Sequence, residues 1–287
     1  LQENNLVGEI PRELGDLTNL LYLNLNNNTL TGSIPEFLGN FPDLQVLGLA
    51  LNDFSGEIPA NLGTLPRLKT LGLSYNPNLS GNLDFATHLK KLEYFYASDC
   101  QFAGKVEENF FYNLPEIRQL DLSRNTLSGQ VPLDIVLHEY DMEVLNLAGN
   151  QFTGKLPELT EANYALTYLN LRDNKISGSL PATIDNLKAV SYLDLQGNML
   201  TGPIPNSMTK MNSVTDLYLG ENRFDATKLP PLNALYDKLE VLSLSGLGLT
   251  GTIPSWISIL ENLRVLDLSN NGYNHTSPSV IWNSPTL

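Results

Sequence analysis

The stretch LLYLNLNNNTLTGSIPEFL, residues 20–38, decides the fold of this chain. Written as L-x-x-L-x-L-x-x-N-x-L-x-G-x-I-P-x-x-L, it returns in the next copy after a shift of 24 residues. A unit of this length cannot bury its apolar side alone, so in-register copies predict a solenoid in which neighbours pack on one another. The copies begin at Leu20, Leu44, Leu68, Leu92, Ile117, Met142, Leu166, Val190, Val214, Leu239 and Leu263.

The copies account for the whole of the 287 residues. Residues 1–19 form an opening half-repeat, and eleven repeats of 24 or 25 residues follow. No linker or low-complexity tract separates them, so we expect a single domain over residues 1–287. Solenoids need polar caps to shield their end turns, and neither end has one. We therefore expect a fragment of a longer chain that lacks both caps.

Alternation along each L-x-L segment predicts a short strand. In the first full copy Leu23 and Leu25 fall on one face, while Tyr22 and Asn24 fall on the other. Strands that recur in one direction stack as a parallel sheet. The return half of each copy is bulkier than the strand half, so we expect the stack to curve with the strands on the inside. The glycine and proline of the return half favour turns over a long helix.

An asparagine follows the strand in most copies, where the chain turns inward and backbone polar groups leave water. A side-chain amide can satisfy these groups because it carries both donors and an acceptor. Cys100 occupies the same position in its copy, and a thiol is small and packs well, which indicates a structural thiol. The asparagines are Asn4, Asn28, Asn52, Asn76, Asn125, Asn150, Asn174, Asn198, Asn222 and Asn271.

Composition argues against several classes of protein. The net charge is −14, from 17 Lys and Arg against 31 Asp and Glu, and no basic run is present, so nucleic acid and acidic membranes are unfavourable partners. No apolar run approaches the ~18 residues of a membrane-spanning helix. The three histidines lack metal-ligand partners at useful spacing, and nucleophile-elbow, zinc-protease and phosphate-loop motifs are missing. We therefore expect no enzyme activity, metal or cofactor.

The return halves share the motif L-x-G-x-I-P. It recurs as LTGSIP at 30–35, FSGEIP at 54–59, LTGPIP at 200–205 and LTGTIP at 249–254. In this motif the chain resembles the plant-type leucine-rich repeat proteins, and the resemblance covers essentially every residue. It departs from them at GNLD, residues 81–84, and at FDATKLPP, residues 224–231. The flanking cysteine pairs and the N-terminal capping helix of the plant proteins are also missing.

The resemblance implies an α/β repeat solenoid. This is a curved, twisted superhelix with a parallel β-sheet on the concave face, short 3-10 or irregular turns on the convex face, and a second short strand near the L-x-G segment. For function it implies extracellular or cell-surface recognition, as in receptor-like kinases, receptor-like proteins and polygalacturonase inhibitors. We expect a receptor ectodomain that binds a protein, peptide or glycan. A structural subunit of a larger assembly and a secreted enzyme inhibitor stay open as alternatives.

The concave strand face is the broad surface whose side chains are not committed to packing, and tyrosines and acids concentrate in its middle. Tyrosine offers a large contact area with a polar tip and is favoured at interface hot spots. The candidate ligand-binding residues are Tyr94, Tyr96, Asp121, Tyr168, Arg172, Tyr192, Asp194, Asp216 and Tyr218. Such a face suits a basic peptide or protein, or a glycan that stacks on the rings. Alternatively, tyrosine is simply a good strand former and aspartate keeps the face soluble.

Three triplets fit the N-glycosylation sequon, which matters on a secreted chain. They begin at Asn27, Asn78 and Asn274. Asn78 and Asn274 fall in the turns after the asparagine position, where a glycan is sterically acceptable. Such triplets also arise by chance in an asparagine-rich repeat.

Overall fold

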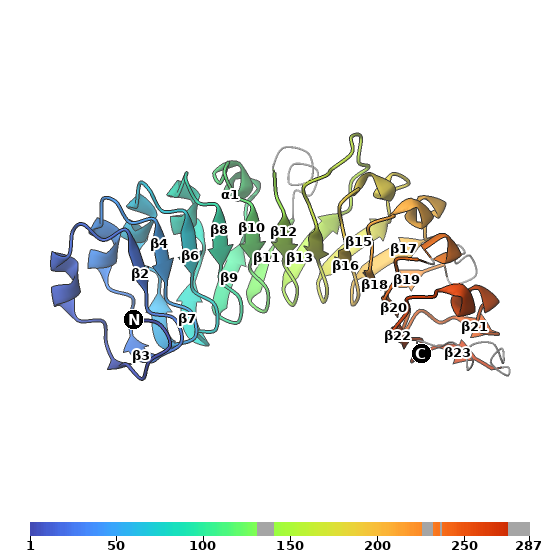
Figure 1. The fold of residues 1–287 in the computed structure, drawn as a ribbon, viewed down its shortest axis with the longest axis horizontal. Coiled ribbons are helices and arrows are strands. Elements are labelled where there is room, and N and C mark those ends of the chain that lie inside the picture. The colour runs from blue at the N-terminus through green and yellow to red at the C-terminus, as the bar shows by residue number, and fades with distance from the viewer. Residues whose placement is uncertain (131–140, 226–231, 236, 275–287) are drawn as a thin grey trace. The chain divides into compact units, whose positions relative to one another are not determined.

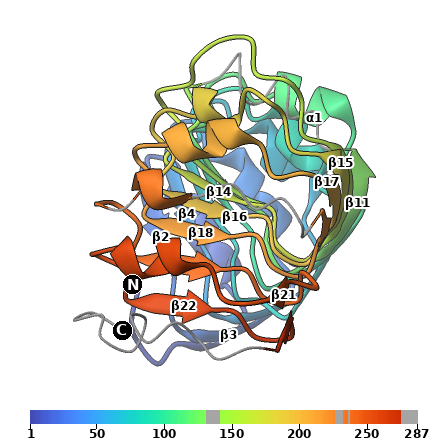
Figure 2. The ribbon, with the colours of Figure 1, turned by 90° about the vertical axis from the view of Figure 1, so that its right-hand side faces the viewer.

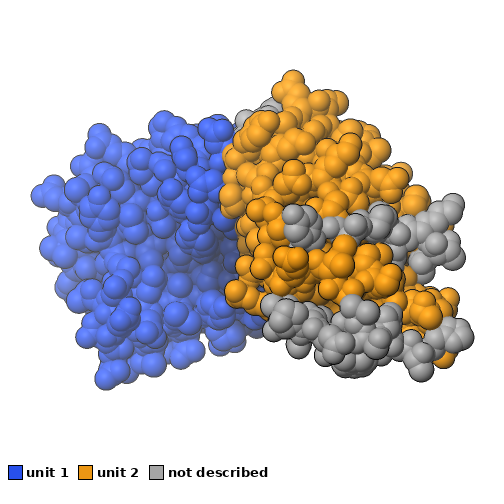
Figure 3. Space-filling model, turned by 45° about the vertical axis from the view of Figure 1, so that its right-hand side comes forward, with its two compact units in different colours: residues 1–152 blue, residues 153–287 orange. Residues whose placement is uncertain are grey.

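The computed structural model describes residues 1–130, 141–225, 232–235 and 237–274. Contacts along the chain divide it into two compact units, Leu1–Phe152 and Thr153–Leu287, coloured blue and orange in Figure 3. Both are built from one repeating element, in which a short strand, an inward turn, a second short strand and a helical turn follow one another. The predicted parallel solenoid is confirmed within each unit.

In the first unit, one strand of each repeat joins a parallel sheet in sequence order, and Figure 1 shows these strands side by side. Residues pair one for one, as Tyr22 does with Val46, so equivalent motif positions form columns across the sheet. We call the exposed side of such a sheet the strand face. The strands are β2 (Tyr22–Asn24), β4 (Val46–Gly48), β6 (Thr70–Gly72), β8 (Tyr94–Tyr96), β10 (Gln119–Asp121) and β12 (Val144–Asn146).

The second short strand implied by the resemblance is also present. In the first unit these strands are β1 (Val7–Gly8), β3 (Thr29–Gly32), β5 (Asp53–Glu57), β7 (Asn78–Gly81), β9 (Gln101–Lys105) and β11 (Thr126–Gln130). The chain returns through the 3-10 turns η1 (Arg12–Asp16), η2 (Glu36–Asn40), η3 (Ala60–Thr64) and η4 (Asp84–His88). One repeat differs, because the α-helical turn α1 (Glu108–Tyr112) replaces its 3-10 turn.

The second unit repeats this plan, and Figure 2 shows β14, β16 and β18 side by side. Its first sheet comprises β14 (Tyr168–Asn170), β16 (Tyr192–Asp194), β18 (Asp216–Tyr218), β20 (Val241–Ser243) and β22 (Val265–Asp267). Its second strands are β15 (Lys175–Ser179), β17 (Met199–Gly202), β19 (Arg223–Phe224), β21 (Thr250–Gly251) and β23 (Gly272–Tyr273), and β13 (Gln151–Lys155) pairs with β15. The 3-10 turns are η5 (Ile184–Asn186), η6 (Asn206–Lys210), η8 (Leu232–Leu235) and η9 (Ser255–Ile259). Most of the aberrant FDATKLPP stretch, residues 226–231, lies outside the described residues.

The motif leucines form the core. Leu23 and Leu25 are buried, whereas Tyr22 keeps 62% of its surface exposed. Burying one such leucine contributes about 1.5–3 kcal/mol, so a full set of repeats supplies the main driving force for folding. The alternation predicted from this segment is confirmed.

The asparagines after the strands form a hydrogen-bond ladder. Asn76 is fully buried and donates to the carbonyl oxygens of Leu49 (3.0 Å) and Leu73 (2.8 Å), in the preceding repeat and in its own. Its Oδ1 accepts from the backbone N–H of Phe54 (3.1 Å). The amide therefore uses both of its capacities, as predicted, and joins two repeats.

Cys100 takes the same position, and its thiol takes over part of the donor role of the amide. Its Sγ lies 3.4 Å from the carbonyl oxygen of Leu73. Elsewhere the asparagine accepts a backbone N–H from the preceding repeat, as Asn76 does from Phe54. In the repeat before Cys100, Pro77 is an extra loop residue, and the N–H of Leu79 donates to the carbonyl oxygen of Asn76 (3.0 Å) in the same loop. This N–H therefore needs no acceptor at position 100. Burial raises the pKa of the Cys100 thiol to about 11, which keeps it protonated. The predicted structural role of this thiol agrees with its surroundings.

We predict that Asn76→Ala and Cys100→Ala differ in cost although they change equivalent positions. Asn76→Ala leaves two carbonyls and one N–H without their amide partner and lowers the free energy of unfolding by about 2–3 kcal/mol, whereas Cys100→Ala costs about 1 kcal/mol or less. Urea denaturation followed by circular dichroism measures both. Equal losses of unfolding free energy would contradict the conclusion that Asn76 satisfies more backbone groups than Cys100 does.

Candidate functional site

The candidate residues lie on the strand faces of both units. Tyr94, Tyr96 and Asp121 belong to the first unit, and the other six belong to the second. All but Arg172 flank the buried central residue of a strand, and Arg172 follows β14. The structure brings together the members within each unit, so the candidates form two groups.

In the first unit, Tyr96 belongs to a chain of hydrogen bonds. Its hydroxyl donates to Oε1 of Gln119 on β10 (2.7 Å), and Gln119 Nε2 donates to Glu143 (3.3 Å). Burial, followed by the charges of nearby groups, raises the pKa of Tyr96 and keeps it a donor. The Tyr96 phenol is therefore already engaged within its own unit.

Ion pairs balance much of the charge near this first group. Across neighbouring strands, Lys69 pairs with Glu93 (2.6 Å), Arg118 with Glu143 (3.2 Å) and Arg124 with Asp99 (3.2 Å). These pairs are largely exposed, so each contributes ~1 kcal/mol or less to stability. They leave the first unit with a nearly balanced strand face.

Three tyrosines of the second unit form an aromatic stack. Tyr168, Tyr192 and Tyr218 come from the adjacent strands β14, β16 and β18. The rings of Tyr168 and Tyr192 are parallel within 9°, with centroids 4.3 Å apart, and Tyr218 follows at 5.4 Å and a 43° tilt. Each such pair contributes about 0.5–1.5 kcal/mol beyond burial. Because Tyr168 and Tyr192 turn one face toward each other, those two faces are closed to a partner.

Asp194 lies against this stack and is only 1% exposed. Its Oδ1 accepts from the N–H of Gln196 (2.9 Å), and its Oδ2 accepts from the Tyr192 hydroxyl at 3.4 Å. Burial raises the pKa of Asp194 to about 6, against the opposing effects of the Gln196 bond and the Arg172 charge. Burial, with the Asp194 charge second, also raises the pKa of Tyr192.

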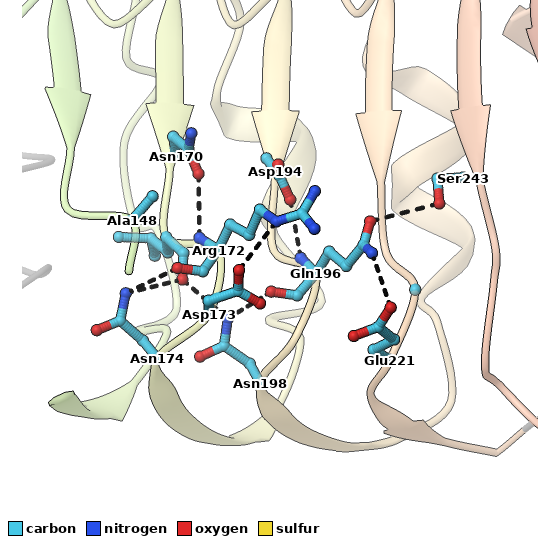
Figure 4. Close-up of polar contacts among 12 residues, drawn as sticks. Ala148, Asn170, Arg172, Asp173, Asn174, Asp194, Gln196, Asn198, Glu221 and Ser243 are labelled. Carbon is cyan, nitrogen blue, oxygen red and sulfur yellow. Dashed lines mark hydrogen bonds and ion pairs between the residues drawn. The ribbon is translucent and has the colours of Figure 1, made fainter. Parts of the chain in front are cut away.

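A polar network extends from this point across the strand face, as Figure 4 shows. The Nε of Arg172 donates to Asp173 (3.1 Å), and the guanidinium reaches toward Asp194. Gln196 donates through Nε2 to Glu221 (3.1 Å) and accepts from the hydroxyl of Ser243 (3.5 Å), two repeats further along. The network therefore fixes polar side chains from four successive repeats.

The charge of the second strand face is unbalanced. Among its described residues, none of the ion pairs includes Asp194, Asp216, Glu221 or Asp267. Arg172 is engaged by Asp173. An excess of carboxylates on an accessible face attracts cationic partners and repels anionic ones.

The third residues of the first-sheet strands, such as Asp121 on β10, form the central column of each strand face. Where such a residue is Asn or Asp, it has a role that the sequence pattern did not predict. The Oδ1 of these residues accepts the backbone N–H two residues later, as Asp121 does from Ser123 (2.9 Å). Short polar side chains commonly make this bond where a strand gives way to a turn. The same bond is made by Asn24, Asn146, Asn170, Asp194 and Asp267. The recurrence of Asn and Asp in one column was the sequence signal for it.

The asparagines of the three sequons are all exposed. Asn27 is exposed in a left-handed turn with φ of 56°, and Asn78 is exposed at the start of β7. Asn274 is exposed too, but the rest of its triplet, residues 275–276, lies outside the described residues. Glycosylation at these positions stays a prediction.

The described ranges lack two other kinds of feature. They contain no group of three or more His, Cys, Asp and Glu side chains that could hold a metal ion. Within the same ranges, no helix has the length and apolar character needed to cross a bilayer.

Comparison with known proteins identifies the family. A leucine rich repeat model matches residues 141–200 and 165–224, and a second model of the same description matches 19–41, 238–260 and 262–284. The solved structure of a leucine-rich repeat protein from Leptospira interrogans is 30% identical, with a TM-score of 0.69, and the match covers 99% of this chain and 74% of that one. This chain belongs to the leucine-rich repeat family.

Within this family the chain is similar to plant receptors. Receptor-like protein 52 of Arabidopsis thaliana is 34% identical over 74 residues, which are 26% of this chain and 9% of the relative. The plant peptide hormone receptor RGFR1, solved in complex with RGF2, is 27% identical with a TM-score of 0.85, and the match covers 99% of this leucine-rich repeat chain and 49% of that one. The chain thus spans less than half of this solved receptor and about a tenth of the curated relative.

We predict that Asp194→Asn makes the protein more stable at neutral pH. The pKa of Asp194 lies above its ordinary 3.8, so ionisation costs stability: the cost is absent below pH 4, grows between pH 4 and 6, and is complete above. Asparagine keeps the acceptor for Gln196 and removes the buried charge. The variant gains roughly 2 kcal/mol at pH 7 and almost nothing at pH 4.

Asp267→Asn is the matched control, because Asp267 occupies the same column. Hydrogen bonds from Ser269 hold the pKa of Asp267 below its ordinary value, so its ionised form stabilises the fold. This variant should lose stability at neutral pH, and the loss should shrink in acid. Urea midpoints at several pH values test both, and an Asp194→Asn gain that is the same at pH 4 and pH 7 would refute the assignment.

Proposed function

We propose that this chain is the ligand-recognition part of an extracellular receptor and that it binds a basic peptide on the strand face of its second unit. The observation that carries the proposal is the stack of Tyr168, Tyr192 and Tyr218 on an otherwise acidic face. Tyrosines fixed by one another lose little entropy on binding, which is why such residues dominate interface hot spots. The similarity to a plant peptide hormone receptor supports a peptide as ligand and the cell surface as its location.

The ring geometry favours a peptide over a glycan. A sugar stacks on the open face of an aromatic ring. Tyr168 and Tyr192 lie 4.3 Å apart and nearly parallel, so their facing sides are filled by each other. Between these two rings no face is left for a sugar, whereas their edges and hydroxyl groups suit the hydrogen-bonding backbone and side chains of an extended peptide.

The charge of the face favours a basic ligand. Asp216 and Glu221 lie on this face and take part in none of the ion pairs found among the described residues, and the charge of the buried Asp194 adds to theirs. A lysine or arginine of the ligand would pair with this excess, whereas an acidic peptide would be repelled. A structural subunit or an enzyme inhibitor could carry the same fold, but neither accounts for the aromatic stack as directly.

We predict that Tyr192→Ala abolishes most of the binding. Panning a random nonapeptide display library against the wild-type protein should enrich peptides rich in Lys and Arg. Removing the middle ring breaks both ring contacts, so the enriched peptides should bind Tyr192→Ala at least tenfold more weakly, as expected for a hot spot of about 2 kcal/mol. Fluorescence anisotropy measures the dissociation constants.

Tyr22→Ala is the control, because Tyr22 occupies the equivalent column of the first unit and is 62% exposed. This variant should bind the enriched peptides like the wild type. The proposal is wrong if the panning enriches no peptide, or if Tyr192→Ala and Tyr22→Ala bind equally well.

We also propose Asn27 and Asn78 as N-glycosylation sites of the secreted protein, because both asparagines are exposed within sequons. After secretion from insect cells, the tryptic peptides that contain them should carry hexose and N-acetylhexosamine mass, lost on treatment with an N-glycan-releasing amidase. Asn27→Gln and Asn78→Gln should each remove one glycan. Unmodified peptides at both positions would refute the assignment.

A further inference from the structure

The charge of Asp194 is not required by the fold. The column to which it belongs needs only an acceptor for the backbone N–H two residues later. On the neighbouring strand Asn170 meets this need with a neutral amide, at 3.0 Å from the N–H of Arg172. Asp194 meets it at 2.9 Å with a carboxylate that is 1% exposed. Burying a charge without an ion-pair partner is costly, so its presence where an amide suffices indicates a use outside folding.

The groups around Asp194 come from three successive repeats. Arg172 is the nearest cation, and its Nε donates to Asp173 at 3.1 Å. Both hydrogen bonds that Asp194 accepts come from neutral donors, Gln196 and Tyr192. The titratable and charged groups that act on it are Arg172 and Asp173 from the β14 repeat, Tyr192 from its own strand and Tyr218 from the β18 repeat. In the next layer, Asp216 and Tyr168 act on Tyr218, and Glu221 acts on Arg172. Acids outnumber the single arginine in this set, so the carboxylate is not neutralised.

Asp194 also determines the hydrogen-bonding direction of the central tyrosine. The Tyr192 hydroxyl donates its proton to Oδ2 of Asp194 at 3.4 Å. With its proton turned inward, the phenol oxygen, which also lies within hydrogen-bonding reach of Tyr168, keeps a lone pair that can accept from a cationic N–H group. When Asp194 takes up a proton from solvent, the carboxyl group can donate to the phenol oxygen. Tyr192 then turns its own proton outward and offers a donor in place of an acceptor.

We propose that Asp194 selects cationic ligands on the tyrosine stack by holding Tyr192 as an acceptor, and that a proton competes with such ligands for this arrangement. The inference rests on the proposed function, since it names the charge selection and regulation of the same face. Asp194 acts through Tyr192 and through its own weakly screened charge, so it is a positioning residue and not a direct contact. Its pKa of about 6 puts the competition in weakly acidic solution.

The sign of the effect follows from linkage. Below the pKa of Asp194 the face has one negative charge fewer and Tyr192 points a donor outward, so a cationic ligand binds weakly. Affinity rises as the pH passes through about 6 and then levels off. By reciprocity, a cationic ligand that binds near this pH displaces a proton.

The binding test uses two fluorescent nonapeptides, (Lys-Gly-Ser)₃ and (Glu-Gly-Ser)₃, at pH 5.0 and 7.5. The wild-type protein should bind the lysine peptide at least fivefold more tightly at pH 7.5 and should bind the glutamate peptide at neither pH. Asp194→Asn should bind the lysine peptide with one weak affinity at both values. Asp216→Asn removes a half-buried acid from the next strand and should weaken binding while keeping the dependence on pH.

A second measurement needs no ligand. In protein labelled with ¹³C at the tyrosine rings, the Tyr192 resonance, assigned with Tyr192→Phe, should titrate near pH 6 in the wild type and stay fixed in Asp194→Asn. If the Tyr192 resonance titrates but the panning enriches no peptide, the proposed function is wrong and the coupling between Asp194 and Tyr192 stands. A resonance that does not respond, or lysine-peptide affinities whose pH dependence survives in Asp194→Asn, overturns the role of Asp194.

Discussion

The side-chain amide that follows most strands of the first sheets is the interaction on which the rest of this structure depends. The chain must turn into the core at that point, and buried backbone groups without partners would offset much of what the leucines contribute. Asn76 resolves this by donating to two carbonyls and accepting from Phe54. Because its partners belong to adjacent repeats, the same bonds set the stagger between repeats. The one-for-one pairing of strands, such as Tyr22 with Val46, is compatible with that stagger.

Columns follow from this register, and the candidate site follows from the columns. Tyr168 and Tyr192 can stack because equivalent positions lie directly beside each other on adjacent strands. Tyr218 joins them from the central column, one step to the side. A repeat protein can thus shape an exposed surface through the side chains at positions that the core leaves free. The same packing excludes Asp194 from water, so its ionised carboxylate costs folding stability.

Much of the fold was predictable from the sequence, because period and alternation depend only on which side chains leave water. Leu23 against Tyr22, the amide ladder and the structural thiol of Cys100 all belong to this class. For the candidate site, the sequence predicted which residues lie on the strand faces but not how their side chains contact one another. Side-chain rotamers decide that Tyr192 stacks on Tyr168, that Tyr96 bonds to Gln119, and that Asp194 is hidden, and rotamers depend on neighbours 24 residues away. The sequence also did not predict that the extra residue Pro77 changes the acceptor of the Leu79 N–H, because this change involves only backbone groups.

The extra residue at Pro77 has a consequence for how this array can change over time. By giving the N–H of Leu79 an acceptor within its own loop, it frees position 100, one repeat later, from carrying an amide. The two sites are therefore epistatic although their side chains need not touch. A lineage that deleted the insertion would come under pressure to restore asparagine at position 100, whereas one that keeps it can drift there among small side chains.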